Sequence, residues 1–537
     1  LDPIRVDLNN GKTFTMVNKS AGRFVWDGIN DMSADGGSTL LFQSGSNALF
    51  EKGFHLHPTA GNPIGLNPDK GAKLSVVLSG RNQNMALFED TAVSNDAGAS
   101  LTAQYYGFVD YQGSWVVFDH DAAAQGTNLA LMDQVDRQTG AASHLSLSTS
   151  GNKTLVNLDY RAPSASFAAA GPNARRGSGA LQEVWSRLLV PNLNGEQQAA
   201  YFSQILGDLR NFTAEAFATQ GTVALSSSYW VTQQALKSDR RSWFSTNGAC
   251  GPSYGEHGGK VRFWAEYIGS YINQDERSGH SGYDVQNNGA IVGVSYDFAN
   301  ALSLGGYFSA SSGETDYDEL RADIDTDILQ VGVFAAYKHP DSGLGVTLDL
   351  YYAWMANDTT RKFMDGRYTG SFDQSVFGLG LKFDYGLKLW ENGCLSPHLG
   401  LRYQHLEQDS FTESGNGLFP LHVKSTDGDM FTTTLGLDLT HNFVFENAVL
   451  TPQLSMAWRH EFGDRDISTN YNIAGMGVVT SARSLKTSAD ALDLGAAITL
   501  QPLKTENISV GINAGYYPSF SANRVEHTFY GGLELKF

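Results

Sequence analysis

Residues Val346-Thr-Leu-Asp-Leu-Tyr-Tyr-Ala-Trp354 decide the fold, because every second side chain in this stretch is large and apolar. Side chains of a β-strand point alternately to opposite faces. One face therefore carries Val346, Leu348, Leu350, Tyr352 and Trp354, and the other carries Thr347, Asp349, Tyr351 and Ala353. The stretch Phe377-Gly-Leu-Gly-Leu-Lys-Phe-Asp-Tyr385 repeats the pattern, with glycine, lysine and aspartate on its second face. Both stretches predict strands with one apolar face and one face of small or polar side chains.

Twelve segments of the C-terminal half show this alternation, at 261–272, 284–298, 301–311, 325–338, 346–354, 377–389, 395–406, 429–444, 449–461, 487–501, 507–517 and 524–537. The connections after even-numbered segments are tight, and those after odd-numbered segments are mostly long, such as 312–324, 408–428 and 463–486. Outer-membrane barrels alternate short turns with long loops, and hydrocarbon cannot satisfy an open sheet edge. Residues 250–537 are therefore predicted to form an all-β, 12-stranded antiparallel transmembrane β-barrel, with a soluble sandwich as the alternative.

Charged residues occupy the polar faces of these segments. They are Arg262, Glu266, Asp349, Lys382, Asp384, Lys388, Arg402, Asp438, Arg459, Asp493 and Glu534. Charges of both signs are costly where a strand faces lipid. We therefore expect these side chains to face the lumen of the barrel, against water or a plug.

A polar helix is predicted ahead of the first strand, at residues 221–240. A helix of about 20 residues is roughly 30 Å long, which matches the hydrocarbon thickness of a bilayer. Its serines and glutamines, at 226–228 and 233–234, make it too polar to face lipid. The segment is expected to lie inside the barrel lumen. Shorter helical patterns at 181–189 and 200–216 precede it, and the Pro/Gly/Ala/Ser-rich stretch 162–178 is expected to be a linker.

The N-terminal third consists of short β-like runs separated by Gly, Asn, Asp and Ser. The runs at 73–78 and 154–160 alternate with period two, and the runs recur loosely along the chain. This organisation suits a parallel β-helix or a sandwich, and the many short strands and few charges favour the β-helix. The predicted domains are 1–162, the β-helix; 163–220, a linker and helical segment; 221–249, the lumenal helix and its connection; and 250–537, the barrel.

Composition excludes several classes of protein. The 537 residues carry a net charge of −19, which argues against nucleic acid, since phosphates are bound mainly by Lys and Arg. No apolar run approaches the roughly 18 residues that a membrane-spanning helix needs. Leu1 does not open a signal peptide, so the chain is expected to be mature or truncated.

Four stretches of the C-terminal half resemble the autotransporters of Gram-negative bacteria, the classical type Va secretion family. They are Val261-Arg-Phe-Trp-Ala-Glu266, residues 289–298, residues 457–463 and the terminal residues 529–537. The resemblance covers about 250–537 and the helical linker before it. It implies a monomer in the outer membrane of a Gram-negative bacterium that exports and displays an N-terminal passenger, pertactin-like and usually serving adhesion or host contact.

The resemblance also implies partners. Phe529, Leu533, Leu535 and Phe537 look like the signal read by the barrel-assembly machinery, although Gly531 interrupts the alternation. Outer-membrane lipids, lipopolysaccharide and an unknown surface or host ligand are the other expected partners. Self-cleaving relatives carry a paired asparagine in the lumenal segment. Asn211 is not paired with a second asparagine, so no lumenal self-cleavage is expected.

The sequence offers little chemistry. Residues 1–162 contain neither a Gly-x-Ser-x-Gly elbow nor Gly-Asp-Ser-Leu. The first alternative to a displayed passenger is therefore a plugged channel with a structural N-terminal cap. A passenger that acts as a hydrolase ranks after both. His55 and His57 share a strand face without a visible third ligand, and His460-Glu461 lacks the second histidine of a zinc helix. We therefore expect no enzyme, and no catalytic, cofactor or metal residues.

The two cysteines leave one question open. In the barrel topology Cys250 precedes the first strand and Cys394 lies in the short turn after the sixth. Both positions fall on the periplasmic side, in an oxidising compartment. A disulfide would need Cα atoms within about 7 Å, although the first and seventh strands lie roughly opposite in the barrel. A bond between the two cysteines and a pair of free thiols both remain possible.

Overall fold

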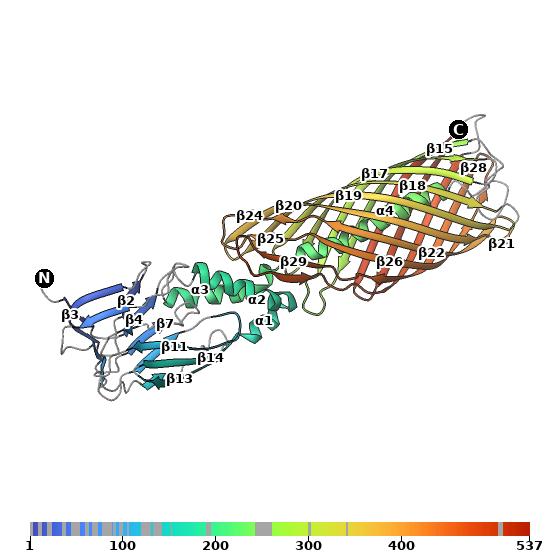
Figure 1. The fold of residues 1–537 in the computed structure, drawn as a ribbon. Coiled ribbons are helices and arrows are strands. Elements are labelled where there is room, and N and C mark those ends of the chain that lie inside the picture. The colour runs from blue at the N-terminus through green and yellow to red at the C-terminus, as the bar shows by residue number, and fades with distance from the viewer. Residues whose placement is uncertain are drawn as a thin grey trace. The chain divides into compact units, whose positions relative to one another are not determined.

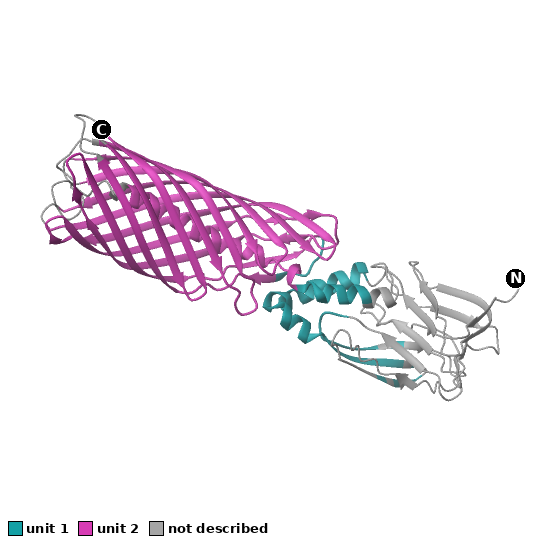
Figure 2. Cartoon of the chain, turned by 180° about the vertical axis from the view of Figure 1, so that it is seen from behind, with its two compact units in different colours: residues 1–209, 475–480 teal, residues 210–474, 481–537 magenta. Residues whose placement is uncertain are grey.

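The computed structural model describes the strands between Ile4 and Gln104 by their backbone, and beyond them residues 107–119, 130–132, 142–151, 153–189, 195–241, 260–298, 302–339, 342–502 and 509–537. The chain forms two compact units (Figure 2). One consists of residues 1–209 with 475–480, and the other of residues 210–474 with 481–537. Each unit has its own architecture.

The second unit is a closed antiparallel barrel (Figure 1). Its strands are β15 (Lys260–Gln274), β16 (Tyr283–Asp297), β17 (Leu302–Tyr317), β18 (Ala322–Lys338), β19 (Leu344–Phe363), β20 (Gly366–Tyr385), β22 (Gly393–Gln408), β26 (Thr426–His441), β28 (Ala448–Gly463), β31 (Asp490–Pro502), β32 (Ser509–Ser521) and β33 (Arg524–Lys536). Each strand pairs with the next, and β15 pairs with β33, from Arg262↔Lys536 to Gln274↔Arg524. The predicted 12-stranded barrel is confirmed.

The two faces of the barrel wall differ as the alternation requires. On β19 the outward side chains of Leu348 and Trp354 are each 50% exposed, whereas the inward side chains of Asp349 and Tyr351 are 3% and 2% exposed. This is the reverse of a water-soluble fold, where the large apolar side chains would be the buried ones. The outer surface is suited to hydrocarbon and the lumen to polar contacts.

Inward aromatic rings lie flat over glycines of the neighbouring strand. Tyr307 on β17 pairs directly with Gly332 on β18, and Tyr351 on β19 with Gly378 on β20. A Cβ atom added to Gly332 would lie 2.3 Å from the Tyr307 ring, and one added to Gly378 would lie 2.0 Å from the Tyr351 ring. Some of the glycines on the inward face are therefore required, because a side chain at these positions would collide with a neighbouring ring.

The two ends of the barrel carry different connections. We call the end with the long connections the loop rim and the end with the tight turns the turn rim. At the loop rim, β23 (Phe411–Thr412), β25 (Leu421–Val423), β29 (Ser468–Ile473) and β30 (Thr480–Arg483) form a small additional sheet, and β24 (Ser414–Gly415) pairs with β20. At the turn rim, β21 (Leu387–Trp390) and β27 (Phe443–Val444) extend the wall.

Helix α4 (Glu215–Arg241) lies inside the barrel, as Figure 1 shows between the strands. It contacts strands β15 to β20, β22 and β29. Its polar side chains, among them Ser228, Thr232 and Gln234, are buried. The predicted lumenal helix is confirmed, and it begins at Glu215 rather than at 221.

The first unit contains helices where a linker was expected. Helices α1 (Ser164–Ala170) and α2 (Pro172–Val184) occupy most of residues 162–178, so that expectation is wrong. The stretch is rich in alanine, the best helix former, and Pro172 opens α2, where its fixed φ and missing N–H cost nothing. The π-helix η2 (Trp185–Leu189) and helix α3 (Gly195–Gly207) follow, and the short 3₁₀ helix η4 (Leu209–Phe212) leads toward α4.

Parallel ladders join most of the described strands of the first unit. One joins β3 (Phe24–Ala34), β5 (Phe54–Pro58), β8 (Phe88–Glu89) and β11 (Tyr111–Asp119). The other joins β2 (Thr13–Asn18), β4 (Thr39–Ser44), β7 (Lys73–Val77), β10 (Ser100–Gln104) and β12 (Ala130–Met132). β1 (Ile4–Leu8) and β6 (Ile64–Leu66) pair with β3, and β9 (Val93–Asn95) pairs with β6. Parallel pairing between successive coils is the arrangement that a β-helix requires.

Antiparallel strands end these ladders. β13 (Ala142–Ser150) and β14 (Lys153–Arg161) form a hairpin that joins the edge of β11. Beside them lies a described core of buried aromatic side chains, in which the Phe108 ring is 4.7 Å from Phe202 and 5.8 Å from Trp185. The Tyr160 hydroxyl donates to the carbonyl of Gly107 at 2.8 Å. Helices and strands of this unit are thus packed on one another.

Candidate functional site: the occupied lumen

The first turn of α4 is fastened to the loop rim. The Glu215 carboxylate accepts a hydrogen bond from the Ser281 amide at 2.8 Å and lies 3.4 Å from Nδ1 of His280. The Tyr317 hydroxyl donates to the carbonyl of Ala216 at 2.8 Å. An acidic side chain in the first turn also complements the positive end of the helix dipole. The start of the helix is therefore held by the connection between β15 and β16 and by the end of β17.

A buried ion pair closes the same rim. The Arg361 guanidinium donates to both carboxylate oxygens of Glu413, at 2.8 and 2.6 Å, and the two side chains are 2% and 0% exposed. It also donates to the carbonyls of Asn211 and Phe419, at 2.8 and 2.9 Å. Buried charges are tolerated only when paired and hydrogen-bonded in this way. Arg361 thereby joins the segment before α4 to the long connection between β22 and β26.

Polar contacts continue along the middle of the helix. Gln220 Nε2 donates to Thr326 Oγ1 at 2.8 Å and to Asn357 Oδ1 at 3.1 Å. Further along α4, Thr232 Oγ1 lies 2.9 Å from the Tyr307 hydroxyl, and Gln330 Nε2 donates to that Thr232 oxygen at 2.7 Å. These contacts fix the rotation of α4 about its axis.

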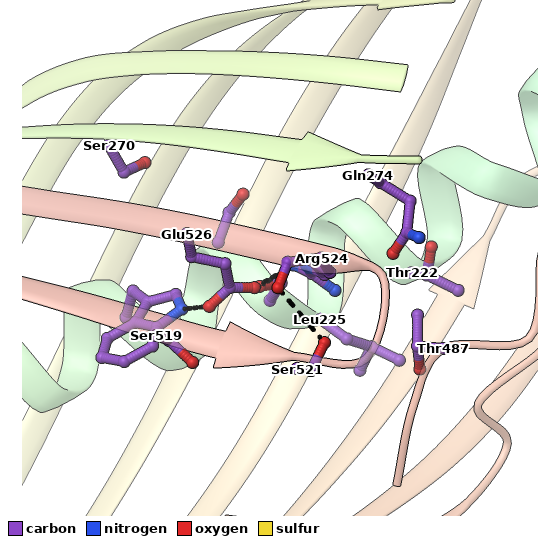
Figure 3. Close-up of polar contacts among 12 residues, drawn as sticks. Thr222, Leu225, Ser270, Gln274, Thr487, Ser519, Ser521, Arg524 and Glu526 are labelled. Carbon is purple, nitrogen blue, oxygen red and sulfur yellow. Dashed lines mark hydrogen bonds and ion pairs between the residues drawn. The ribbon is translucent and has the colours of Figure 1, made fainter. Parts of the chain in front are cut away.

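A buried carboxylate on β33 anchors another side of the helix (Figure 3). Glu526 accepts hydrogen bonds from Trp230 Nε1 at 2.5 Å and from Ser226 Oγ at 3.1 Å. It pairs with the Arg524 guanidinium, and Arg459 lies 3.6 Å away. Two cationic side chains offset the cost of burying the Glu526 charge.

The last turns of α4 are held at the turn rim. Gln234 Nε2 and Ser238 Oγ donate to the same oxygen of Glu266, at 2.6 and 2.5 Å. The Lys237 ammonium lies 3.4 Å from the centroid of the Tyr517 ring, a cation–π contact. Both ends of the helix are therefore fastened to the wall.

The structure brings most of the charges expected in the lumen together as pairs. Arg262 bonds Asp297 at 2.6 Å, and Arg402 bonds Asp349 at 2.9 Å. Arg459 lies 3.2 Å from Asp493, and Lys382 lies 3.9 Å from Asp438. The Glu534 side chain is buried and that of Asp384 is half-buried. Lys388 was wrongly expected in the lumen. It lies on β21, which precedes the tight turn into β22 and whose four residues are all exposed.

Sequence reasoning missed the groups with the most extensive contacts. Arg361, Glu413, Arg524 and Glu526 were not singled out, although Arg361 and Glu526 continue the period-two pattern of their strands. For Arg361 the available signal was that alternation, extended past Trp354. For Glu413 the sequence holds no comparable signal, because it lies between the two short strands β23 and β24 in a long connection.

The terminal strand presents its alternating apolar side chains outward. Phe529, Leu533, Leu535 and Phe537 are 44%, 54%, 39% and 47% exposed. The Phe537 amide donates to the Val261 carbonyl at 3.1 Å, and its ring lies 6.0 Å from that of Phe263. The last residue of the chain therefore contributes to the seam between β33 and β15.

Cys394 is the second residue of β22 and is disulfide-bonded. Cys250 lies outside the described residues, so the pairing of the two cysteines stays a prediction. The side chains of His55 and His57 are also outside the described part. Within that part, no group of three or more His, Cys, Asp and Glu side chains is arranged to hold a metal ion. His460 Nδ1 lies 2.7 Å from Asp490 on the outer wall.

The loop rim carries a surplus of carboxylates around Arg210. Its guanidinium lies 3.9 Å from Glu276 and 4.0 Å from Glu319. A hydrogen bond with Glu319, together with the Glu319 charge, raises the pKa of Glu276. Burial raises the pKa of Asp318, and the Glu319 charge adds to that shift. Crowding of negative charge at this rim is thus greatest at neutral pH.

No helix among the described residues is both long and apolar enough to cross a membrane. A closed barrel with an apolar outer wall, a polar lumen and alternating turns and loops defines an outer-membrane β-barrel protein. Residues 263–515 match the family model of the autotransporter beta-domain. This part of the chain belongs to the autotransporter family, and the barrel lies in the outer membrane of a Gram-negative bacterium.

Several relatives and solved structures are similar to parts of this chain. YaiT of Salmonella typhimurium, an uncharacterised protein, is 26% identical over 41% of this chain and 22% of its own length. Outer membrane protein A of Rickettsia conorii is 26% identical over 31% of this chain and 8% of its own. The translocator domain of the autotransporter NalP from Neisseria meningitidis superposes with a TM-score of 0.46, at 16% identity, over 60% of this chain and 99% of that domain. The chain spans about a fifth or less of the length of the curated relatives it matches first.

Proposed function

We propose that the chain exports and displays its own N-terminal passenger, and that the passenger serves adhesion or contact with a host or surface. The observation that carries this proposal is α4 itself, which runs once through the closed barrel from the loop rim to the turn rim. A chain threaded in this way leaves at the loop rim on its N-terminal side. In an outer-membrane barrel the long loops face outward, so the residues before 210 would be exposed on the cell surface.

The fastening of α4 supports a passenger that stays attached. The helix is bonded at its first turn through Glu215, at its middle through Trp230 and at its end through Ser238. Removing it would take away the hydrogen bonds that Glu526 and Glu266 accept from α4, and a hydrogen bond to a charged group contributes about 1.5–3 kcal/mol. We infer that the helix is a permanent plug once export is complete.

Attachment also requires that the chain is not cut in the lumen. Asn211, the asparagine nearest the start of α4, accepts a hydrogen bond from the Arg321 amide to its side chain at 2.5 Å and one from Arg361 to its carbonyl at 2.8 Å. The two bonds hold both the side chain and the carbonyl of Asn211 in place at the loop rim. This arrangement supports an uncut chain.

A binding rather than catalytic passenger is part of the proposal. It is supported by the lack of a recognisable nucleophile motif in residues 1–162. The competing function has support from one relative, an extracellular serine protease of Serratia marcescens, 21% identical over 51% of this chain and 26% of its own length. A surface hydrolase activity that disappears when residues 1–162 are deleted would favour that alternative.

The proposed partners follow from location and surface. The outward apolar wall suits outer-membrane lipids and lipopolysaccharide, and the terminal Phe529–Phe537 segment suits the barrel-assembly machinery. The passenger would contact an unidentified surface or host ligand, and one chain suffices to close the barrel, which suits a monomer. The net charge of −19 does not favour nucleic acid.

Protease treatment of intact cells tests the display. We expect loss of the N-terminal unit and survival of a membrane-embedded fragment that begins near Arg210 and ends at Phe537. The control is the same treatment after permeabilisation, which should produce the same fragment. Protection of the N-terminal unit in intact cells, lost on permeabilisation, would place it in the periplasm and favour the plugged channel with a structural cap.

A second experiment tests the role of the passenger. Cells that carry the full chain are compared with cells that carry a chain lacking residues 1–162, at equal amounts of folded barrel. We expect the full chain to increase attachment to abiotic surfaces or host cells, and the shortened chain to have no such effect. Equal attachment by both would contradict an adhesive passenger while leaving the barrel assignment unchanged.

A further inference from the structure

A line of phenylalanines crosses one parallel ladder of the first unit. Phe24 of β3 pairs with Phe54 of β5. Phe54 pairs in turn with Phe88 of β8, and Phe88 pairs with Phe118 of β11. Successive residues of a strand alternate between the two faces of its sheet. The residue that follows each phenylalanine therefore lies on the other face, and these residues are also in register with one another.

That other face carries histidines and carboxylates at adjoining positions. His55 of β5 pairs with Glu89 of β8, and Glu89 pairs with Asp119 of β11. His57 lies two residues beyond His55, on the same face of β5, and pairs with Asp27 of β3. The three neighbouring strands β3, β5 and β8 therefore place two histidines and two carboxylates together on one face of the sheet.

The described residues of β14 show which face this is. Asp119 pairs with Lys153 of β14, and directly paired residues share a face. Lys153 is exposed, and Asp159 on the same face is partly exposed. Val156 and Leu158, on the opposite face of β14, are 0% and 3% exposed. The histidines and carboxylates thus lie on the face of the sheet that is open to solvent at β14.

The spacing of these residues suits a shared metal ion. Paired residues on neighbouring strands are about 4.8 Å apart, and residues two positions apart on one strand are about 6.6 Å apart. Helical zinc sites use two histidines one turn apart, with Cβ atoms separated by about 5–6 Å. Histidine nitrogen and carboxylate oxygen are both ligands of Zn²⁺. The sequence alone left His55 and His57 without a visible third ligand, and the ladder supplies one at Glu89.

The charges along the row also favour a bound cation. Glu89 and Asp119 are directly opposite each other, and like charges in that arrangement destabilise a sheet. On its other side Asp119 has Lys153 as its neighbour in register, so the protein itself provides a cation there. A metal ion shared by His55 and Glu89 would provide one at the other end of the row. The alternative is a ladder of ion pairs that binds no metal.

We propose that His55, His57 and Glu89 form a binding site for a divalent transition-metal ion, with Asp27 completing a set of four ligands. Two histidines with carboxylates are a ligand set that suits such ions. The ion would link the three parallel strands β3, β5 and β8. An ion that binds only the folded state stabilises it, so the site would stabilise the ladder of the first unit. The proposal does not depend on what the passenger binds.

Zinc titration of the full chain, purified without a histidine tag, tests the site. Competition with a colorimetric chelator measures the affinity, and we expect one Zn²⁺ ion per chain. His55→Ala and His57→Ala should each weaken binding by at least about tenfold, since even the outer partners of a metal site contribute that much. The matched control is His144→Ala. His144 of β13 also pairs with a carboxylate, Asp159, but has no second histidine on its strand, so its loss should leave the affinity unchanged.

Two results of this titration would overturn the proposal. One is a full chain that binds no Zn²⁺. The other is an affinity that stays the same in the double variant His55→Ala with His57→Ala, because the ion would then be bound elsewhere.

A pair of carboxylate variants separates a metal site from a ladder of ion pairs. Glu89→Gln and Asp119→Asn each remove one negative charge from the same row. Glu89→Gln should weaken Zn²⁺ binding by at least about tenfold because it removes a ligand, whereas Asp119→Asn should have little effect. Equal losses in the two variants would assign the effect to the overall charge of the row and contradict the site.

Measurements on the unaltered chain keep the test decisive if a variant does not fold. Co²⁺ bound in place of Zn²⁺ should show the intense visible absorption of a four-coordinate ion, in contrast to the weak absorption of the hydrated ion. Added Zn²⁺ should raise the temperature at which the first unit unfolds, and a chelator should lower it, while the unfolding of the barrel is unchanged. Weak Co²⁺ absorption, or no shift with Zn²⁺, would overturn the proposal.

Discussion

The outer and inner faces of the barrel strands show opposite relations between polarity and exposure. On the outer face, large apolar side chains such as Leu435, 55% exposed, are in their preferred surroundings because those surroundings are lipid. On the inner face, charged side chains such as Arg361 and Glu526 are almost fully buried, yet they are surrounded by polar and oppositely charged groups. The energetic effect of burying a side chain therefore depends on whether hydrocarbon, water or polar groups surround it. The following predictions test this contrast, from the largest expected effect to the smallest.

Breaking the buried ion pair should have the largest effect. Glu413→Ala leaves the Arg361 guanidinium buried without its carboxylate, and we expect the free energy of unfolding to fall by about 3–5 kcal/mol. Urea-induced unfolding in lipid vesicles, followed by tryptophan fluorescence, measures the loss. The double variant Arg361→Met with Glu413→Leu removes both charges and should recover much of it. If the double variant is as unstable as Glu413→Ala, the loss is not due to the unpaired charge.

A charge placed on the outer wall should have the next largest effect. Leu435→Arg puts a cation near the middle of β26, and we expect a cost of about 2–4 kcal/mol for a cation at the bilayer midplane. Leu418, in the connection between β24 and β25, is 47% exposed and serves as the control. Since its surroundings are water, Leu418→Arg should change stability by no more than about 0.5 kcal/mol. Equal costs at the two leucines would mean that the outer wall is not in lipid.

The packing of the inner wall is tested by adding a methyl group. Gly332→Ala places a Cβ atom 2.3 Å from the Tyr307 ring, so the ring must move, and we expect a loss of about 1–3 kcal/mol. At Gly531 the nearest neighbour of such an atom, the carbonyl oxygen of Asn513, would be 3.9 Å away. Gly531→Ala should therefore be nearly neutral. The same unfolding measurement compares the two, and a neutral Gly332→Ala would show that the ring is not confined by the wall.

The smallest effect is expected in the water-exposed first unit. A hydrogen bond from the Ala162 amide, at 3.0 Å, lowers the pKa of Asp110, and Arg161, 3.2 Å away, adds to this. A lowered carboxyl pKa contributes stability above its unfolded value that is lost as pH falls through the folded value. Asp110→Asn should thus destabilise this unit slightly at neutral pH and have no effect in strong acid. A loss that is independent of pH would assign the effect to geometry instead of charge.

The strands and the lumenal helix could be predicted because their signals are local and repeated. Each membrane-crossing strand shows period two, and α4 shows an apolar pattern with too many serines and glutamines for lipid. The alternating length of the connections then predicted the closure of the barrel. The linker at 162–178 was misread, because its prolines and glycines were taken as helix breakers. In the structure Pro163 precedes α1 and Pro172 opens α2, positions that helices tolerate.

The contacts that hold the plug could not be predicted in the same way. Arg361 and Glu413 are 52 residues apart and meet because the long connection between β22 and β26 folds back over the rim. Trp230 and Glu526 are 296 residues apart and meet only when the barrel has closed around the helix. Lumen-facing residues could be named from alternation, but their partners depend on strand order, helix rotation and loop path. None of these is encoded in a local pattern.

Pairing of β33 with β15 sets the order of events in the assembly of the barrel. One edge of β15, the first barrel strand, has no partner until β33, the twelfth, has been synthesised. A chain released early would keep two exposed edges and could not be sealed in hydrocarbon. Only a chain that includes β33 can therefore be closed into a barrel. The helix must also be inside, or on its way through, before the seam is shut.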